Sequence, residues 1–345
     1  MRMSQKKSFV IGSIGILALF MILFMNAVSR IYKYHFSVPE NHPLFIADLS
    51  DIRDETLSHY YVHTKGQKVQ AVQSGLYADP PFDASGIPLV DYGNETGLQY
   101  NPVTIAQYGL DNYELFLQTQ DTYYLDGFLK QADWLLMNQE EGKWYYRFDH
   151  PVLSLKKPWI SAMSQGQGIS VLMRAYQYSG ERIYLESAKH AFEVFRISVK
   201  EGGISVFYEY GTWYEEYPDA ESPSHVMNGH IWALFGLWDL YRVTRDPEVL
   251  YYFTRGVSAL RADLDRFDTG YWVLYDLKSH CFLVDQLYID FKIDQLRALH
   301  AITDDSLFYQ YASNWEKYQH QKVNIVRMMG PSLWRKVKLK LNGLF

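Results

Sequence analysis

The feature that most constrains this chain is a helical pattern that returns about every 60 residues. Apolar residues at a spacing near 3.6 predict pairs of helices with short links inside each pair. The first helix of each pair is expected to begin near residues 104, 161, 228 and 286. Since one pair cannot bury its apolar face alone, the pattern predicts a mainly α fold, an α/α-barrel of about four helical hairpins.

The links between the pairs are much longer than those within them, at residues 138–160, 200–227 and 265–285. All three follow a second helix, so they are expected at the same end of the array. Loops of this length inside a compact domain are usually functional. We therefore expect the site at the end where these glycine- and aromatic-rich links meet.

Residues 8–29 carry no charge and are long enough for a membrane-spanning helix, which needs about 20 residues. The basic residues before them favour a cytoplasmic N-terminus. A cleaved signal peptide is the rival, but the apolar core is long and 25–29 is a poor cleavage site. We predict a cytoplasmic tip and signal anchor over 1–30, with the body extracellular, periplasmic or in the Golgi lumen.

Three further regions follow the anchor. Residues 31–100 are rich in proline and predict an extended or β lead-in segment, and residues 101–320 form the predicted barrel domain. Residues 321–345 predict a basic amphipathic tail, which would lie either on a membrane surface or against the barrel.

Charge and composition argue against several classes of function. Between the two basic ends the chain has 23 basic and 39 acidic residues, which disfavours nucleic-acid binding. The single Cys281 rules out an intrachain disulfide and a thiolate zinc cluster. Gly166 and Gly168 lie within a predicted helix and indicate close helix packing rather than a phosphate loop, and His59 with His63 is a weak metal signal. We expect no cofactor and no metal.

Tyrosines and a carboxylate gather on the long links. Glu216 and Tyr217 lie in Trp-Tyr-Glu-Glu-Tyr-Pro (213–218), Tyr275 lies in the last link, and Tyr288 follows it. Such groups suit proton transfer at a weakly acidic carbon. The acidic residues around 209–221 could instead supply a glycosidase pair.

Five motifs in order resemble those of the D-glucuronyl C5-epimerases, and together they span about residues 100–318. They are Tyr-Asn-Pro-Val-Thr-Ile-Ala-Gln-Tyr-Gly-Leu (100–110), Trp-Ile-Ser-Ala-Met-Ser-Gln-Gly-Gln (159–167), the 213–218 stretch with Asn228-Gly229 after it, Asp-Thr-Gly with Leu-Tyr-Asp-Leu (268–277), and Tyr288 ahead of Ile-Asp-Gln-Leu (293–296).

The resemblance implies an isomerase that converts D-glucuronate to L-iduronate residues within a heparosan- or heparan-sulfate-like polysaccharide. It also implies an α/α-barrel on the luminal or outer side of a membrane, and catalytic roles for Glu216, Tyr217, Tyr275 and Tyr288. The large β-domain of animal members is shortened or missing here. Lys278, Asp285 and Lys292-Ile293-Asp294 depart from the family pattern, which bears on the polysaccharide and its sulfation.

The chemistry sets the other requirements of the site. Removal of the C5 hydrogen, α to a carboxylate, makes an enolate that needs nearby positive charge and hydrogen-bond donors. That charge is also expected to lower a tyrosine pKa from about 10, so that a phenolate can act as the base. The predicted substrate-binding residues are Lys278, Asn228, His230, Lys292, Gln165 and Trp213.

Two other functions stay open. A uronate lyase would remove the same C5 proton and then expel the C4 substituent. A membrane-anchored glycan-binding protein would keep the cleft without the catalysis. The partner is a glucuronate-containing polysaccharide in the leading interpretation, and the sequence leaves a homodimer open.

Overall fold

The computed structural model describes residues 51–62 and 81–330, apart from 94, 152, 154, 280, 281, 285 and 329. The predicted anchor, much of the lead-in, the tail from 331 onward, and Cys281 and Asp285 lie outside the described residues. Within the described residues, no helix has both the length and the apolar character needed to cross a membrane.

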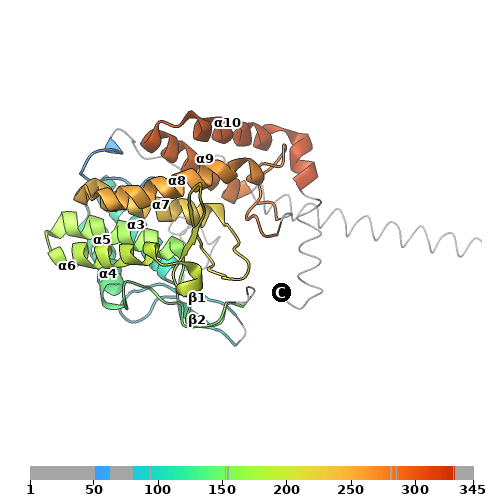
Figure 1. The fold of residues 1–345 in the computed structure, drawn as a ribbon. Helices are drawn as coiled ribbons and strands as arrows, with labels where there is room; N and C mark the ends of the chain where they lie inside the picture. Colours follow the sequence, from blue (N-terminus) through green and yellow to red (C-terminus); the bar gives the residue numbers. More distant parts are fainter. Residues whose placement is uncertain are drawn as a thin grey trace, which may run out of the picture.

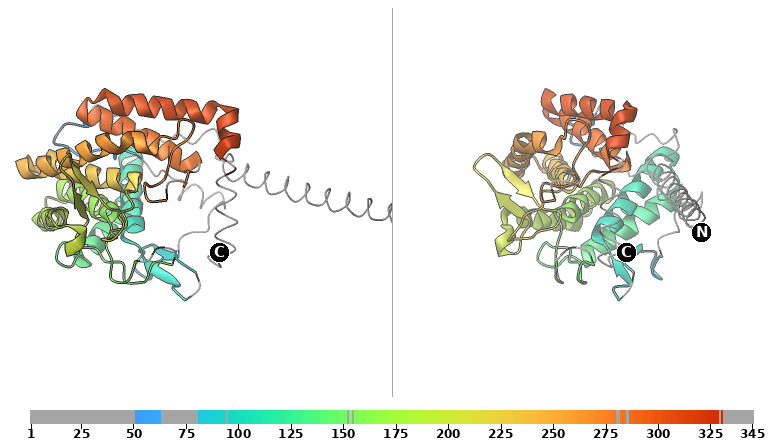
Figure 2. Two further views of the ribbon diagram at one scale, coloured as in Figure 1. Left: turned by 45° about the vertical axis from the view of Figure 1, so that its right-hand side comes forward. Right: turned by 90° about the vertical axis from the view of Figure 1, so that its right-hand side faces the viewer.

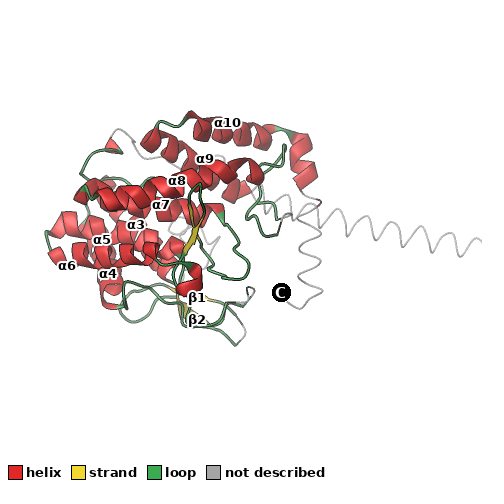
Figure 3. Ribbon diagram, in the orientation of Figure 1, coloured by secondary structure: helices red, strands yellow, loops and turns green. Residues whose placement is uncertain are grey.

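Four helical hairpins make up most of the described chain, and the fold is mainly α (Figures 1 and 3). They are α3 (Pro102–Thr119) with α4 (Thr122–Met137), α5 (Ala162–Ser179) with α6 (Arg182–Glu193), α7 (Met227–Thr244) with α8 (Pro247–Phe267), and α9 (Gln286–Thr303) with α10 (Ser306–His320). The first helices begin at 102, 162, 227 and 286, so the predicted hairpins and their repeat are confirmed.

Every hairpin turns in the same way. A residue in the left-handed region ends the first helix, with φ of 58° at Gln120, 75° at Gly180, 54° at Arg245 and 58° at Asp304. An acidic residue follows it before the second helix. In three hairpins its side chain caps that helix, as Asp246 does by accepting from the Glu248 amide. This two-residue link keeps the paired helices antiparallel.

The first helices of the hairpins pack side by side in the order α3, α5, α7, α9, and each second helix covers its own partner. Figure 2 shows this arrangement from two further sides. The axes of α5 and α7 come closest at two glycines. A Cβ on Gly236 would lie 2.2 Å from the Gly166 carbonyl oxygen, and one on Gly166 would lie 2.4 Å from the Trp232 oxygen. Close packing is therefore confirmed as the reason for Gly166.

Short strands occur only beside the helices in the described part of the chain. β1 (Leu89–Asp91) pairs antiparallel with β2 (Leu98–Tyr100), and β3 (Ser205–Phe207) pairs antiparallel with β4 (Thr212–Tyr214). Helix α6 ends at residue 193, and the chain passes into two 3₁₀ turns, η2 (Val194–Arg196) and η3 (Val199–Glu201). Beyond α6, the Ile197 carbonyl oxygen accepts a hydrogen bond from the Ser205 amide, at the start of β3.

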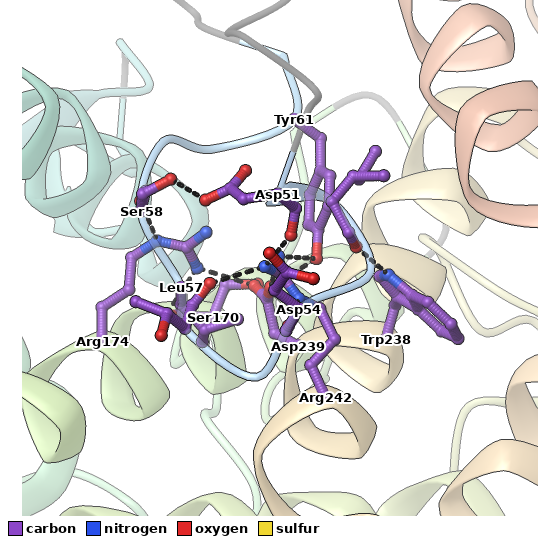
Figure 4. Close-up of polar contacts among 12 residues, drawn as sticks. Asp51, Asp54, Leu57, Ser58, Tyr61, Ser170, Arg174, Trp238, Asp239 and Arg242 are labelled. Atoms are coloured by element: carbon purple, nitrogen blue, oxygen red, sulfur yellow. Dashed lines mark hydrogen bonds and ion pairs between the residues drawn. The ribbon is translucent and has the colours of Figure 1, made fainter.

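Residues 51–62 close the end of the array that is formed by the C-terminal turns of α5 and α7 (Figure 4). A group that we call the rear cluster lies there and consists of Tyr61, Arg174, Asp239 and Arg242. Asp239 accepts from Arg174 at 2.7 Å and from the Tyr61 hydroxyl. Arg242 donates at 2.6 Å to three carbonyl oxygens of residues 51, 54 and 56. The two arginines thus fasten this segment to the helices.

Candidate active site

All three long links meet around Tyr217, as the sequence predicted. From the first link, the rings of Trp159 and His150 lie 6.2 and 5.7 Å from the Tyr217 ring. From the third link, the Leu277 amide donates to the Ser224 carbonyl oxygen of the second link at 3.0 Å. The site therefore lies at the end where α5 and α7 begin, opposite the rear cluster.

Glu215 fixes the direction of the chain at the site. Its carboxylate is fully buried and accepts from the Ser224 amide and hydroxyl and from the amide and ring of His225. Its carbonyl oxygen accepts from the Ala162 amide, at the start of α5, at 2.9 Å. These contacts hold the Glu215 side chain inside the protein, and the next side chain, Glu216, points the other way into the site.

Glu216 is buried against the first turn of α7. The backbone N–H of Gly229 donates to its carboxylate, and the side-chain Nδ2 of Asn228 lies 3.4 Å from Oε2. A Cβ on Gly229 would lie 2.3 Å from Oε2, so only glycine fits there. Burial raises the Glu216 pKa to about 7, although the Tyr217 hydrogen bond and the charge of Lys292 oppose that shift.

The three predicted catalytic tyrosines lie in a row that leads from Glu216 to the surface. Tyr217 donates to Glu216 and is hydrogen-bonded to Tyr275, whose ring centroid is 5.8 Å from that of Tyr288. A phenol has one proton, so while Tyr217 donates to Glu216 it accepts from Tyr275. Tyr217 and Tyr275 are partly buried, and Tyr288 is 38% exposed. We call these three residues the tyrosine row.

The expected lowering of a tyrosine pKa is wrong for two members of the row in this structure. Burial, followed by the negative charge of Glu216, raises the pKa of Tyr217 and of Tyr275 well above 10. No positive charge of the described residues is among the main causes of either shift, so none offsets these effects. Both phenols are therefore protonated, whereas the pKa of Glu216 lies near neutrality.

Lys292, on the second turn of α9, is the buried positive charge of the site. Its Nζ has no hydrogen-bond partner among the described residues and lies 5.3 Å from the Phe267 ring centroid. Burial lowers its pKa to about 7, while the carboxylates of Glu216 and Asp276 raise it. Lys292 is 0% exposed, so it faces Glu216 from within the protein and not from the open side.

Three of the predicted binding residues, Gln165, His230 and Trp213, lie inside the helical wall, and the protein itself uses the polar groups of Gln165 and His230. Gln165 donates to the Gly142 oxygen at 2.7 Å and accepts from the Trp144 amide, which ties the first link to α5. His230 accepts from the Tyr214 amide, and its Nε2 lies 3.0 Å from the Gly256 oxygen. Burial lowers its pKa to about 3.

Trp213 is also fully buried, stacked between the rings of His225 and His230 at 4.7 and 4.2 Å. Lys278 is 45% exposed on the third link, and its Nζ lies 2.9 Å from Asp219 on the second link. Of the predicted binding residues, Asn228 and Lys292 lie beside Glu216, and the other four lie farther out or within the wall.

An aromatic wall lies beside the tyrosine row, and the sequence analysis did not name its members as binding residues. Tyr146 and Trp159 stack with centroids 3.8 Å apart, and Phe148 and Tyr92 extend the contact. The Tyr146 hydroxyl lies 3.2 Å from Asn101, which caps α3. These residues lie on irregular links without a period, so only the family motif that begins at Trp159 could have indicated them.

Comparison with known proteins identifies the family of this chain. The family model for the D-glucuronyl C5-epimerase C-terminus matches residues 137–317, which is more than half of the chain and includes the four motifs from Trp159 onward. The chain belongs to the D-glucuronyl C5-epimerase family. Glu216 and the tyrosine row all lie inside the matched region. Within the described residues, no group of three or more His, Cys, Asp or Glu side chains could hold a metal ion.

Two curated proteins are similar to this family member over about half of its length. It is 31% identical over 217 residues to the D-glucuronyl C5-epimerase of Caenorhabditis elegans, covering 56% of this chain and 35% of the worm protein. It is 29% identical over 178 residues to an uncharacterized protein of Methanocaldococcus jannaschii, covering 50% of this chain and 57% of the archaeal one. The chain thus spans less than two thirds of either relative.

Solved structures with related helical arrangements are more distant. An unsaturated glucuronyl hydrolase specific for heparin covers 64% of each chain with a TM-score of 0.46 and 14% identity. A GH76 α-mannanase of Bacteroides thetaiotaomicron covers 73% of this chain and 68% of its own, with a TM-score of 0.47 and 13% identity.

Proposed function

We propose that this protein is a polysaccharide hexuronate C5-epimerase, which converts D-glucuronate to L-iduronate residues by removing the C5 proton and returning one from the opposite face. The observation that carries the proposal is Glu216, a buried carboxylate with a pKa of about 7, hydrogen-bonded to the first member of a row of three tyrosines. A general base works best when its pKa lies near the working pH.

The proton leaves C5 toward Glu216, either directly or through Tyr217. In the second path the Tyr217 oxygen takes the C5 proton as its own proton moves to Glu216, so no free phenolate is needed. The C5–H bond breaks and its electron pair enters the enolate of the substrate carboxylate. Burial and the charge of Glu216 raise the pKa of Tyr217. The Tyr217 phenol is therefore protonated while Glu216 is ionised and able to accept a proton.

The return proton comes from another member of the tyrosine row. Tyr275 is a protonated phenol, and Tyr288 connects it to solvent because more than a third of its surface is exposed. A new C5–H bond forms on the other face. The tyrosine that gave the proton then recovers one from water, and Glu216 releases the proton that it accepted through the row to water. No oxidant or reductant is required, since one proton leaves and one proton returns. Which tyrosine serves which face stays open.

Substrate positioning in this proposal uses the aromatic wall and the helix starts. The stacked pair of Tyr146 and Trp159 offers flat ring surfaces with polar edges, which suit sugar rings. In the first turn of α7 the Gly229 backbone N–H donates to Glu216, and such helix starts favour negative charge. A glucuronate residue bound here would have its sugar ring against the aromatic rings and its carboxylate beside the helix start. We propose a heparosan- or heparan-sulfate-like polymer as the substrate.

The anchor over 1–30, with the barrel outside the cytoplasm, belongs to the same proposal, because a secreted polysaccharide is modified on that side of a membrane. The lyase alternative shares the first step only. It would need an acid placed for the C4 oxygen, and we find no observation that favours it over a return of the proton to C5.

The deciding experiment is exchange of the C5 hydrogen in heavy water. Full-length protein is incubated with a glucuronate polymer such as heparosan, and proton NMR follows the loss of the C5 signal. We expect deuterium at C5 and new iduronate signals without shortening of the chain. Glu216→Gln should abolish the exchange. Unsaturated, shortened products would establish a lyase instead, and absence of exchange with every glucuronate polymer would reject the epimerase.

A further inference from the structure

Lys292 is a buried cation that has no direct role in the proposed proton transfer through the tyrosine row. It projects from α9 into the space between Phe267 of α8 and the Glu216 carboxylate, and it has no hydrogen-bond partner among the described residues. An unpaired ammonium group in an apolar setting costs several kcal/mol unless a charge nearby compensates it. A side chain that served only packing would be more stable as a methionine or leucine.

The charges that face Lys292 identify its partner. Glu216 raises its pKa most among the neighbouring charges, and Asp276 of the third link follows. Asp276 already accepts from the Ser279 amide at 2.6 Å. On α9 itself, Asp294 lies beside Arg297, with Asp290 and Glu316 as its further neighbours, and is not among the charges that act on Lys292.

Glu216 is held by groups on its other sides as well. Its contacts comprise the Tyr217 hydroxyl, the Gly229 and Asn228 donors, and the nearby carboxylate of Glu215, which opposes its ionisation. The hydroxyls of Tyr146 and Tyr275 also feel its charge. Among the charges that act on Glu216 in the described residues, Lys292 is the cation, and with the Tyr217 hydrogen bond it opposes the rise in the Glu216 pKa that burial causes.

We propose that Lys292 is a positioning residue that acts through Glu216: its buried ammonium group keeps Glu216 ionised behind the tyrosine row, so that Glu216 can accept the proton that leaves C5. The inference rests on the proposed epimerase reaction but concerns a residue that does not touch the substrate. When Glu216 has taken the proton, Lys292 is left without its counter-charge, and this favours return of the proton to the row.

The kinetic test compares Lys292→Met with Lys292→Arg. Methionine keeps most of the volume and removes the charge, so the Glu216 pKa should rise. We expect the acidic limb of kcat/KM for C5 exchange to move up by about one pH unit, which is about a tenfold loss below the limb. Lys292→Arg keeps a permanent charge and should keep the limb at or below its original pH. Lys189→Met, on the exposed face of α6, is the control and should match the parent.

A second measurement does not depend on activity. Because the folded-state pKa of Lys292 is lowered to about 7 from 10.5, the unfolded chain binds more protons between these values. Lys292 therefore makes the free energy of unfolding rise with pH from about 7 to 10.5. Denaturant unfolding of the full-length chain should show this rise in the parent, and Lys292→Met should lack it.

These results separate the two proposals. If exchange is absent from the parent but the rise in stability is present and lost in Lys292→Met, the buried pair is real and the proposed reaction is wrong. If Lys292→Met exchanges at C5 with the parental pH profile, the inference about Lys292 is overturned. A loss of rate with an unchanged pH profile would overturn it too, because that is the result of a purely structural role.

Discussion

Two groups of buried charges lie at opposite ends of the same helices, and they differ in how they are paired. The rear cluster joins Arg174 and Asp239, both 0% exposed, at 2.7 Å and adds hydrogen bonds to backbone oxygens of residues 51–62. At the other end, Glu216 and Lys292 are also buried, but the ammonium group has no hydrogen-bond partner among the described residues.

The physical consequence is visible in the protonation of each end. Asp239 raises the pKa of Arg174, so that side chain is charged at every accessible pH. Glu216 and Lys292 both have a pKa of about 7, so a proton moves onto or off them near neutrality. Complete pairing gives a rigid joint, whereas incomplete pairing gives groups that can exchange protons. The following predictions test this difference, from the largest effect to the smallest.

Removal of the central charge of the rear cluster should cost the most stability. Asp239→Asn leaves the guanidinium groups of Arg174 and Arg242 buried without their counter-charge, and we expect a loss of about 3–5 kcal/mol in the free energy of unfolding. Denaturant titration measures it. The exposed Asp265→Asn on α8 is the control, with almost no change expected. An Asp239→Asn protein that unfolds like the parent would show that the pairing does not hold this end.

Removal of one hydroxyl at the active-site end should lower activity and leave stability nearly unchanged. Tyr217→Phe keeps the ring, so we expect the melting temperature to stay near that of the parent while C5 exchange falls by about 10²–10⁴-fold. At least one of Tyr275→Phe and Tyr288→Phe should behave in the same way. Tyr271→Phe, whose ring packs under Arg327, is the control and should stay active. Near-parental exchange in all three variants of the row would reject their catalytic assignment.

Displacement of Glu216 without change to its chemistry tests whether position matters. A Cβ on Gly229 would overlap Glu216 Oε2, so Gly229→Ala should push the carboxylate out of line with Tyr217. We expect C5 exchange to fall by about 10²-fold, as small misplacements of reacting groups typically cause. Gly330→Ala meets no atom within 4 Å and is the matched control. Unchanged exchange in Gly229→Ala would mean that Glu216 tolerates another orientation.

The pH dependence of stability reports on Glu216 directly. Its folded-state pKa is raised from 4.5 to about 7, so the folded protein binds the extra proton between these values. This group therefore makes the parent less stable as pH rises from 4.5 to 7. Glu216→Gln removes that loss, so the stability of the variant relative to the parent should increase over this range. Unfolding titrations at pH 5 and pH 7 decide it, and a constant difference would contradict the buried, neutral form.

The exposed ion pair of Lys278 and Asp219 should give the smallest effect. Its partners are 45% and 32% exposed, and such pairs contribute roughly 0–1 kcal/mol. We expect Lys278→Met to unfold within that range of the parent. If Lys278 binds the polymer, as the sequence analysis expected, KM should rise with little change in kcat. An unchanged KM would show that Lys278 does not contribute to polymer binding, so that positive charge acts only in the buried site.

The helical pairs could be predicted because their cause is local. Apolar periodicity and caps such as Asp246 before Pro247 act within a few residues, so the starts of the first helices agree with the structure within two positions. Glu216 and the tyrosines were assigned as catalytic residues on ordered motifs, and the structure brings these residues together. Gln165 and Trp213 lie in the same motifs and His230 follows one of them, but a motif does not separate a residue that faces the cleft from one that holds the wall.

The sequence by itself determined the repeat, the ends of most helices and the residues gathered at one end, because periodicity, caps and turn chemistry are short-range effects. Only the tertiary structure decided the protonation of the site. The pKa values of Tyr217, Glu216 and Lys292 depend on burial by α7, α8 and α9, which come from distant parts of the chain. Burial disfavours every charged form, and its strength depends on packing that a linear sequence does not display.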